Sequence, residues 1–259
     1  MSRSDQGRLY EKDDYKGEVA HGGIDYKDFF SILNGQLLPR TYLEIGTDVG
    51  ESLSRWECDA ICVDPNFRFG QDPTGRRRRT FLFQMTSREF FAHYDPRLLF
   101  HGGVDVAFQD GLHRFEELLH DFIGTERCCH RNSLMILHDC LPLNERMAEK
   151  DFRMDETEAP WTKFHWTGDV WRILPILKEL RPDLRIFLID CPPTGLVLCS
   201  RLNPYSTALL RNFDTIVSRY SAISLSSFGL SSLYQMFPML DSRKIAADPQ
   251  CLANVLDLR

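Results

Sequence analysis

Two short groups of acids and imidazoles each follow a run of apolar residues. The run VDVAFQ leads into Asp110-Gly-Leu-His113, and the run SLMIL leads into His138-Asp139. Because the carboxyl ends of neighbouring parallel strands meet at one edge of a sheet, we expect these side chains around one crevice. Carboxylates are preferred ligands of hard divalent cations, and histidine titrates near neutral pH. The pattern favours a site in which the two acids position a nucleophile or an ion and one histidine acts as a base.

Each of these residues also has a structural interpretation. A single histidine is often a packed core or helix-capping residue, and Asp110 could be the N-cap of a helix that follows it. Two acid–imidazole pairs at two successive strand ends favour function over these alternatives.

A turn of small residues follows the first strand-like run, TYLEI. The candidate cofactor-binding residues are Glu44, within this run, and Gly46, Thr47, Gly50 and Ser52, within the turn. Small residues let the backbone approach a ligand at the carboxyl end of a strand. The spacing lacks the GxGxxG pattern of dinucleotide-binding proteins, so no pyrophosphate site is predicted.

Two further candidates follow the second and third strand-like runs. Asp64 ends the second run, and a carboxylate there can accept both ribose hydroxyls of a nucleoside. The alternative for Asp64 is a plain strand–helix–strand turn with an exposed aspartate. Ser87, in TSREFF, either belongs to a helix cap or meets an adenine edge.

The segment WTGDVW places Asp169 after a long irregular stretch at residues 140–167. Irregular stretches of this length are often functional lids, so Asp169 and its tryptophans are candidates for lining a substrate pocket. The alternative is that Asp169 or Thr167 caps a helix. The run Arg76–Arg79 is most simply a solvated loop, because no interleaved aromatic residues support nucleic-acid binding.

The elements that would hold these residues alternate between strands and helices. Strands are expected at residues 41–46, 60–65, 80–85, 104–110, 133–139, 185–190 and 195–202, and helices at 26–38, 51–56, 114–128 and 170–180, the last kinked at Pro175. Near-continuous apolar strands indicate a mostly parallel α/β sheet with helices on both faces. The short CPPT connection makes the last two strands antiparallel.

The chain divides into three expected parts. Residues 1–24 show no periodicity and predict a mobile tail, and residues 25–204 hold the α/β domain. Residues 205–259 predict a helical C-terminal extension, whose apolar segment LSSLYQMFPML is a candidate contact for a homo-oligomer.

Composition narrows the class of protein. The 259 residues carry 31 basic and 37 acidic side chains, and a net charge of -6 gives no general attraction to nucleic acid or to an anionic membrane. No apolar run reaches the ~18 residues of a membrane span, and the N-terminus lacks the apolar core of a signal peptide. The eight cysteines are irregularly spaced and are expected as reduced thiols. We therefore expect a soluble, cytoplasmic protein.

Taken in order, these motifs resemble those of the class I S-adenosylmethionine (SAM)-dependent methyltransferases, and most closely a bacterial small-molecule branch with DGLH and HD motifs. The resembling segments are YLEIGTDVGESL, VDP, MTSREFF, FQDGLHRFEELLHDF, LMILHDCLP, WTGDVWRILPILKELRPDL and PTGLVL. The resemblance implies a Rossmann-like seven-stranded sheet with a reversed last strand. It also implies that the acid and glycine turn hold the amino-acid part of SAM, that Asp64 holds the ribose, and that Asp110 lies near the methyl donor.

The resemblance also raises the question of a metal ion. In metal-dependent relatives such as catechol O-methyltransferase, Asp110 and Asp139 would match magnesium-binding carboxylates. Where those enzymes have an asparagine, this chain has Cys140, a poor magnesium ligand. His138 or His113 is a candidate replacement, with Mg²⁺ or a softer divalent cation as the ion.

The expected function is methyl transfer from SAM to an oxygen or nitrogen nucleophile of a small molecule, in specialised biosynthesis. The expected catalytic residues are His113, His138, Asp110, Asp139 and Asp169. Two other functions stay open: attack on another carbon of the sulfonium, giving cyclisation or aminocarboxypropyl transfer, and a regulatory protein that only binds SAM. A nicotinamide-dependent dehydrogenase is disfavoured by the missing GxGxxG.

Overall fold

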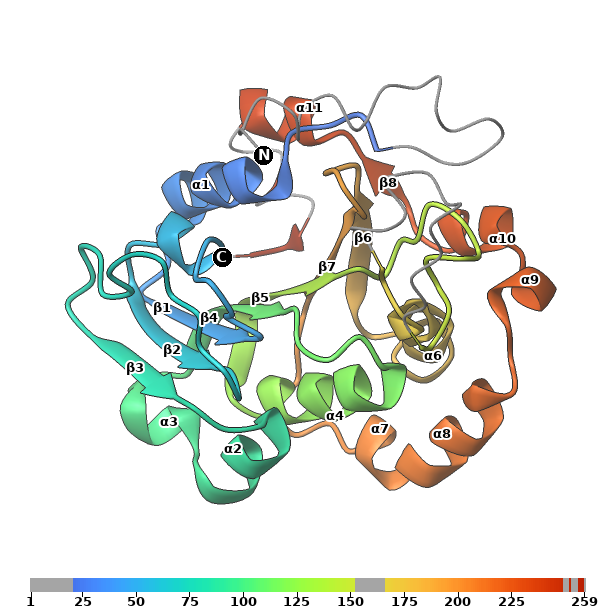
Figure 1. The fold of residues 1–259 in the computed structure, drawn as a ribbon, viewed down its shortest axis with the longest axis horizontal. Helices are drawn as coiled ribbons and strands as arrows, with labels where there is room; N and C mark the ends of the chain where they lie inside the picture. Colours follow the sequence, from blue (N-terminus) through green and yellow to red (C-terminus); the bar gives the residue numbers. More distant parts are fainter. Residues whose placement is uncertain (1–20, 152–165, 249–251, 253–255, 259) are drawn as a thin grey trace.

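The computed structural model describes residues 21–151, 166–248, 252 and 256–258. They form one eight-stranded sheet with helices on both faces (Figure 1). Most of the expected tail lies outside the described residues, as does the middle of the irregular stretch at 140–167. Residues 21–24 differ from the expected tail, because the Gly23 amide donates to the Asp190 carbonyl oxygen at 2.9 Å and the Ile24 amide donates to Ser242 Oγ at 2.8 Å.

The sheet has the strand order β3-β2-β1-β4-β5-β7-β6-β8. Its strands are β1 (Thr41–Ile45), β2 (Asp59–Val63), β3 (Thr80–Phe83), β4 (Val104–Gln109), β5 (Cys129–His138), β6 (Arg185–Ile189), β7 (Leu196–Ser200) and β8 (Met239–Leu240). Strands β1 to β5 pair in parallel, and β7 is antiparallel to both β5 and β6. The predicted α/β class, the seven strands and the reversed last strand are confirmed.

The eighth strand was not predicted. β8 comes from the C-terminal extension and pairs in parallel with β6. It contains two residues, which is too short for an alternating pattern to appear in the sequence. The C-terminal extension, which was expected to be helical, therefore also adds an edge strand to the sheet.

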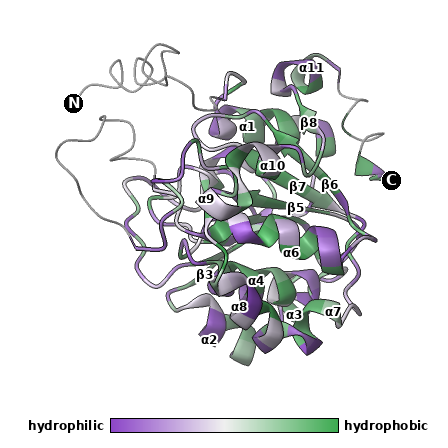
Figure 2. Ribbon diagram, turned by 90° about the vertical axis from the view of Figure 1, so that its right-hand side faces the viewer, coloured by the Kyte–Doolittle hydropathy of each residue, from purple (hydrophilic) through white to green (hydrophobic). Residues whose placement is uncertain are grey.

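Two apolar layers cover the sheet, because side chains alternate between its faces along each strand. One face packs against α1 (Tyr26–Leu37) and α11 (Ser242–Ala247). The other face packs mainly against α2 (Ser87–His93), α3 (Pro96–Leu99), α4 (Phe115–Glu126), α6 (Ile173–Leu180), α7 (Ala208–Arg211), α8 (Phe213–Ser221), α9 (Leu225–Phe228) and α10 (Leu230–Tyr234). Figure 2 shows hydrophobic strands between these layers and hydrophilic residues on outer helices such as α2 and α8.

The helix expected at residues 51–56 is wrong. The structure has only the short 3-10 turn η3 (Leu53–Arg55) between β1 and β2. Trp56 ends this turn in an extended conformation, with its ring buried against Tyr42 at a centroid distance of 5.0 Å. Burying the tryptophan in this way takes the chain out of the helical conformation.

The helix expected at residues 170–180 is present, and Pro175 lies near the start of its α-helical part. It begins as the 3-10 turn η4 (Val170–Arg172) and continues as α6. Pro175 is the third residue of α6, so it lies in the first turn, where backbone amides have no partner within the helix.

The N-terminal segment and the C-terminal extension meet at the loop that follows β5. The hydroxyl of Tyr234 in α10 lies 3.0 Å from His21 Nε2 and donates to the carbonyl oxygen of Leu141 at 3.0 Å. Leu141 is two residues after Asp139, so both ends of the chain fix this loop. Burial lowers the pKa of His21 to about 4.

This buried histidine predicts a loss of stability in acid. Because the folded-state pKa lies below the unfolded value, the unfolded chain binds the proton first. The contribution is therefore intact above about pH 6.5 and is lost as the pH falls toward 4, by about 2 kcal/mol between pH 7 and pH 5. Urea unfolding at both pH values should show this loss in the native chain and less of it in His21→Asn.

The exposed His101 supplies the control. His101→Gln should keep the pH dependence of the native chain. An identical pH dependence in His21→Asn and in the native chain would show that His21 is not the titrating group.

Candidate active site

The candidate site lies at the carboxyl ends of β1, β4 and β5. Asp110 directly follows β4, and Asp139 directly follows β5. Asp139 has a φ of 57°, a conformation that residues other than glycine rarely adopt and that is often found at functional sites. The sequence-based expectation that these groups meet at one edge is met.

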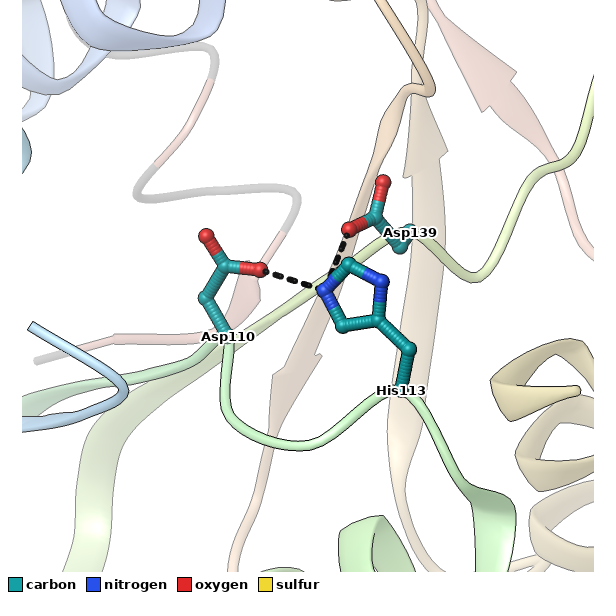
Figure 3. A group of neighbouring side chains, drawn as sticks. All are labelled: Asp110, His113 and Asp139. Carbon is teal, nitrogen blue, oxygen red and sulfur yellow. Dashed lines mark ion pairs between the residues drawn. The ribbon is translucent and has the colours of Figure 1, made fainter. Parts of the chain in front are cut away.

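Both aspartates face the same nitrogen of His113 (Figure 3). His113 Nε2 lies 3.1 Å from Asp139 Oδ2 and 3.7 Å from Asp110 Oδ1. One ligand atom of each residue lies within 4.8 Å of the others, so the three side chains could hold a metal ion. Each comes from a segment that follows a strand, which makes the arrangement a property of the fold.

His138 also contacts both aspartates. Its Nδ1 lies 3.1 Å from Asp110 Oδ1 and 3.2 Å from Asp139 Oδ2. We call Asp110, His113, His138 and Asp139 the acid–imidazole cluster. Each aspartate therefore contacts both histidines.

Opposite charges set the protonation of this cluster. Burial opposes ionisation of every member, but the charges of Asp139 and Asp110 outweigh it and raise the pKa of His113 to about 9. The same carboxylates raise the pKa of His138. In turn, the histidines lower the pKa of both carboxyl groups despite their burial. These shifts favour carboxylates and imidazolium groups within the cluster.

The glycine turn after β1 lies directly against the cluster. A Cβ atom on Gly46 would come within 2.0 Å of the Asp110 carbonyl oxygen, and Gly46 has a φ of 86°. Only glycine allows this approach. The turn and the cluster therefore belong to one site.

Beneath this turn, buried polar atoms lack partners. Neither carboxylate oxygen of Glu44 has a hydrogen-bond partner within the described residues, and the same is true of Thr47 Oγ1. Burial and the charge of Asp110 raise the pKa of Glu44. Unpartnered buried polar atoms are costly, so these atoms fit a polar group of a bound cofactor.

Asp64 is held at the edge of the same turn. Its Oδ2 accepts from the Asp48 amide at 2.8 Å, and its Oδ1 accepts from the Asn66 amide at 2.7 Å. Each carboxylate oxygen keeps a second lone pair, so the group can still accept hydroxyl groups of a ligand. The geometry is compatible with the predicted ribose contact.

The remaining predicted cofactor residues lie around the turn and after β3. Gly50 has a φ of 80° and packs against Phe69, and Ser52 is buried at the start of η3. Ser87 is the first residue of α2, whose cap is Thr86. The helix-cap interpretation of this segment therefore applies to Thr86, and Ser87 stays a predicted adenine contact.

Asp169 has a structural role in the described part of the chain. Its Oδ1 accepts from the Phe115 amide at 2.8 Å, at the start of α4, and its Oδ2 pairs with Arg172. The side chain is buried, with both oxygens engaged. The capping alternative is the one that the structure supports, although the helix capped is α4 and not the helix that follows Asp169.

The segment around Asp169 supports His113. The Trp166 carbonyl oxygen accepts from His113 Nδ1 at 2.8 Å. A Cβ on Gly168 would come within 1.9 Å of the His113 carbonyl oxygen, and that oxygen accepts from the Asp169 amide at 3.3 Å. The motif WTGD therefore fixes His113.

Sequence reasoning missed two residues of the site. The ring of Tyr26, the first residue of α1, lies 4.4 Å from the His138 ring. Thr194, between β6 and β7, donates to Asp139 Oδ1 at 2.7 Å. Neither has a local sequence signal, because both reach the cluster from segments more than 50 residues away.

Two other predictions need comment. The seven described cysteines are free thiols, as expected, and Cys140 Sγ donates to the His138 carbonyl oxygen at 3.2 Å.

The arginine run is not only a solvated loop. Arg77 donates to the carbonyl oxygens of Leu53 and Trp56, at 3.1 and 2.7 Å, and so holds η3 in place.

Residues 43–140 match the sequence model of a methyltransferase domain. The match runs from β1 to the residue after Asp139, so it contains the glycine turn, Asp64 and the whole acid–imidazole cluster. The match lies within the α/β domain expected at residues 25–204. No curated protein matches the chain.

Several solved structures are similar to this chain. They include cofactor-bound Rv0187 from MTB, with 16% identity over 69% of this chain and 80% of that chain and a TM-score of 0.49. The O-methyltransferase TomG from Streptomyces achromogenes, involved in tomaymycin synthesis and solved with SAM, has 13% identity over 69% and 80% and a TM-score of 0.49. An O-methyltransferase from Bacillus cereus, in complex with SAH, has 12% identity over 77% and 91% and a TM-score of 0.45.

The chain has no candidate for a membrane span in its described part, where every helix is too short or too polar to cross a bilayer.

The structural role of Asp169 predicts a loss of stability on substitution. Asp169→Ala removes the cap of α4 and leaves buried Arg172 without its carboxylate, so the free energy of unfolding should fall by about 3 kcal/mol or more. Urea unfolding measures this. As a control, Asp151→Ala removes the exposed partner of Arg114 and should change the free energy by less than about 1 kcal/mol. Equal stability of Asp169→Ala and the native chain would refute the structural role.

Proposed function

We propose that this protein is a SAM-dependent methyltransferase that methylates an oxygen or nitrogen nucleophile of a small molecule. One observation carries the proposal: the acid–imidazole cluster lies against the glycine turn, within residues that match a methyltransferase domain. A cofactor held by the turn would present its reactive carbon toward the cluster. The two halves of a group-transfer site are therefore adjacent.

The polar groups around the glycine turn match those of SAM. Asp64 is proposed to accept the ribose hydroxyls, and Ser87 to meet the adenine. Glu44 and Thr47 have buried atoms without partners, which would meet the amino-acid part, directly or through water. Gly46, Gly50 and Ser52 would shape the turn around that part. SAM itself supplies an electrophilic methyl group on a sulfonium.

The acceptor half is proposed to orient the nucleophile. Asp110 and Asp139 would hold its polar hydrogen, and positive charge on the histidines or on a bound divalent cation would stabilise the anion that forms. The methyl carbon forms a bond to the nucleophile as its bond to sulfur breaks, and the proton of the nucleophile passes to solvent. Tyr26 and Thr194 keep His138 and Asp139 in position for this step.

The cofactor assignment predicts the effect of one substitution. Asp64→Ala removes the proposed ribose acceptor, so the Kd for SAM, measured by calorimetry, should rise about 10- to 100-fold. The control Asp72→Ala changes an exposed aspartate in the same loop and should leave the Kd unchanged. Unfolding curves of both variants report whether Asp64→Ala has also lost stability. An unchanged Kd in a folded Asp64→Ala protein would refute the ribose contact.

Product mass tests the reaction. Incubation with SAM and a panel of phenols, catechols and amines should release S-adenosylhomocysteine together with an acceptor heavier by one methylene. Release of methylthioadenosine would instead support attack on another carbon of the sulfonium. Binding of SAM without turnover, across a wide panel, would support a regulatory protein.

A further inference from the structure

The geometry points to a one-imidazole, two-carboxylate metal centre made by Asp110, His113 and Asp139, which prefers a transition metal ion such as Mn²⁺, Co²⁺, Fe²⁺ or Zn²⁺ over Mg²⁺. The inference rests on the proposed function only for the use of the ion in catalysis. The binding of the ion can be measured alone.

The tautomer of His113 determines which of its ring nitrogens can bind a metal ion. Its Nδ1 lies 2.8 Å from the carbonyl oxygen of Trp166, and a carbonyl oxygen only accepts. Nδ1 therefore bears the hydrogen, and the lone pair of the neutral ring is on Nε2. Metal-binding histidines usually donate their other ring N–H to a carbonyl or carboxylate in this way.

Two carboxylate oxygens lie close to the lone pair on Nε2. Nε2 faces Asp139 Oδ2 at 3.1 Å and Asp110 Oδ1 at 3.7 Å. Three electron-rich atoms that converge on one point need a positive charge between them. A cation bound to all three atoms would supply this charge.

His138 differs from His113 in this respect and is a positioning residue. One nitrogen, Nδ1, lies near both carboxylates, at 3.1 and 3.2 Å, so its hydrogen is donated to oxygens that would bind the metal. Its other nitrogen, Nε2, is 3.5 Å from Thr194 Oγ1. Each carboxylate oxygen has lone pairs for both the ion and this hydrogen bond. The sequence left both His138 and His113 as candidate ligands, and the geometry favours His113.

The types of ligand atom determine which metal ion the centre prefers. Mg²⁺ prefers oxygen ligands, whereas imidazole suits transition metal ions. The neighbouring thiol does not complete the set, because Cys140 Sγ donates to the His138 carbonyl oxygen at 3.2 Å. Two carboxylates and one imidazole therefore favour a borderline divalent ion over both Mg²⁺ and the soft ions that thiolates select.

Metal binding to the chelator-treated full chain tests the inference, without SAM or acceptor. Titration with Mn²⁺ and Co²⁺, followed by electron paramagnetic resonance and visible absorption, should show one equivalent bound at least about tenfold more tightly than Mg²⁺ in calorimetry. Pulsed resonance spectra of the Mn²⁺ complex should show coupling to an imidazole nitrogen. No bound ion, or equal or tighter binding of Mg²⁺, would overturn the inference.

Variants assign the ligand. His113→Asn should remove the nitrogen coupling and the preference over Mg²⁺, and His113→Gln serves if the first variant does not fold. His138→Gln should keep the coupling and weaken binding about 10- to 100-fold, as expected for a positioning residue. His130→Gln changes another imidazole–carboxylate pair, with Asp105, and should match the native chain. Coupling that survives in both His113 variants and disappears in His138→Gln would overturn the assignment.

These outcomes are separable from the proposed function. Failure to bind a transition metal ion, with SAM binding and methyl transfer intact, overturns only the metal centre. Selective metal binding by a protein that does not bind SAM supports the metal centre and refutes the proposed reaction.

Discussion

The acid–imidazole cluster is the interaction on which the rest of the site depends. Asp139 and His138 are buried, and unpaired buried charges are strongly destabilising. The four groups are stable together because each carboxylate contacts both imidazoles. The protein must therefore supply these groups in fixed positions, and distant segments contribute to this. Trp166 binds one histidine through its carbonyl oxygen, Tyr26 packs against the other, and Thr194 donates to Asp139.

The fold meets this requirement at the ends of adjacent parallel strands. β4 and β5 pair in register up to Gln109 and Leu137, so the residues that follow both strands emerge side by side. β1, the other neighbour of β4, brings the glycine turn to the same edge. The C-terminal extension contributes through Tyr234, which holds the loop after Asp139, and through β8, which widens the sheet.

The parts predicted correctly from the sequence depend on neighbours in the chain. Continuous apolar runs indicated the seven strands, and the positions of Asp110 and Asp139 at strand ends placed them at one edge. The parts that the sequence did not reveal depend on contacts between distant residues. Burial of the Trp56 ring ends a helix that local propensity favours, and a hydrogen bond to Phe115 gives Asp169 a structural role. The Tyr26 and Thr194 contacts have the same origin, since no local pattern reports them.

Contacts with distant residues give the two histidines different roles, although their side chains are chemically identical. Both face the same carboxylates, and the sequence offers no reason to separate them. His113 has one nitrogen committed to the Trp166 carbonyl oxygen, so its other nitrogen is left to bind a cation or a proton. Among the described residues, His138 Nδ1 contacts the two carboxylates and no carbonyl oxygen. Gly168 and Asp169 contact the carbonyl oxygen of His113, and only glycine allows the close approach at position 168. The motif WTGD, which suggested a catalytic acid, thus acts by determining which atom of His113 is available for chemistry.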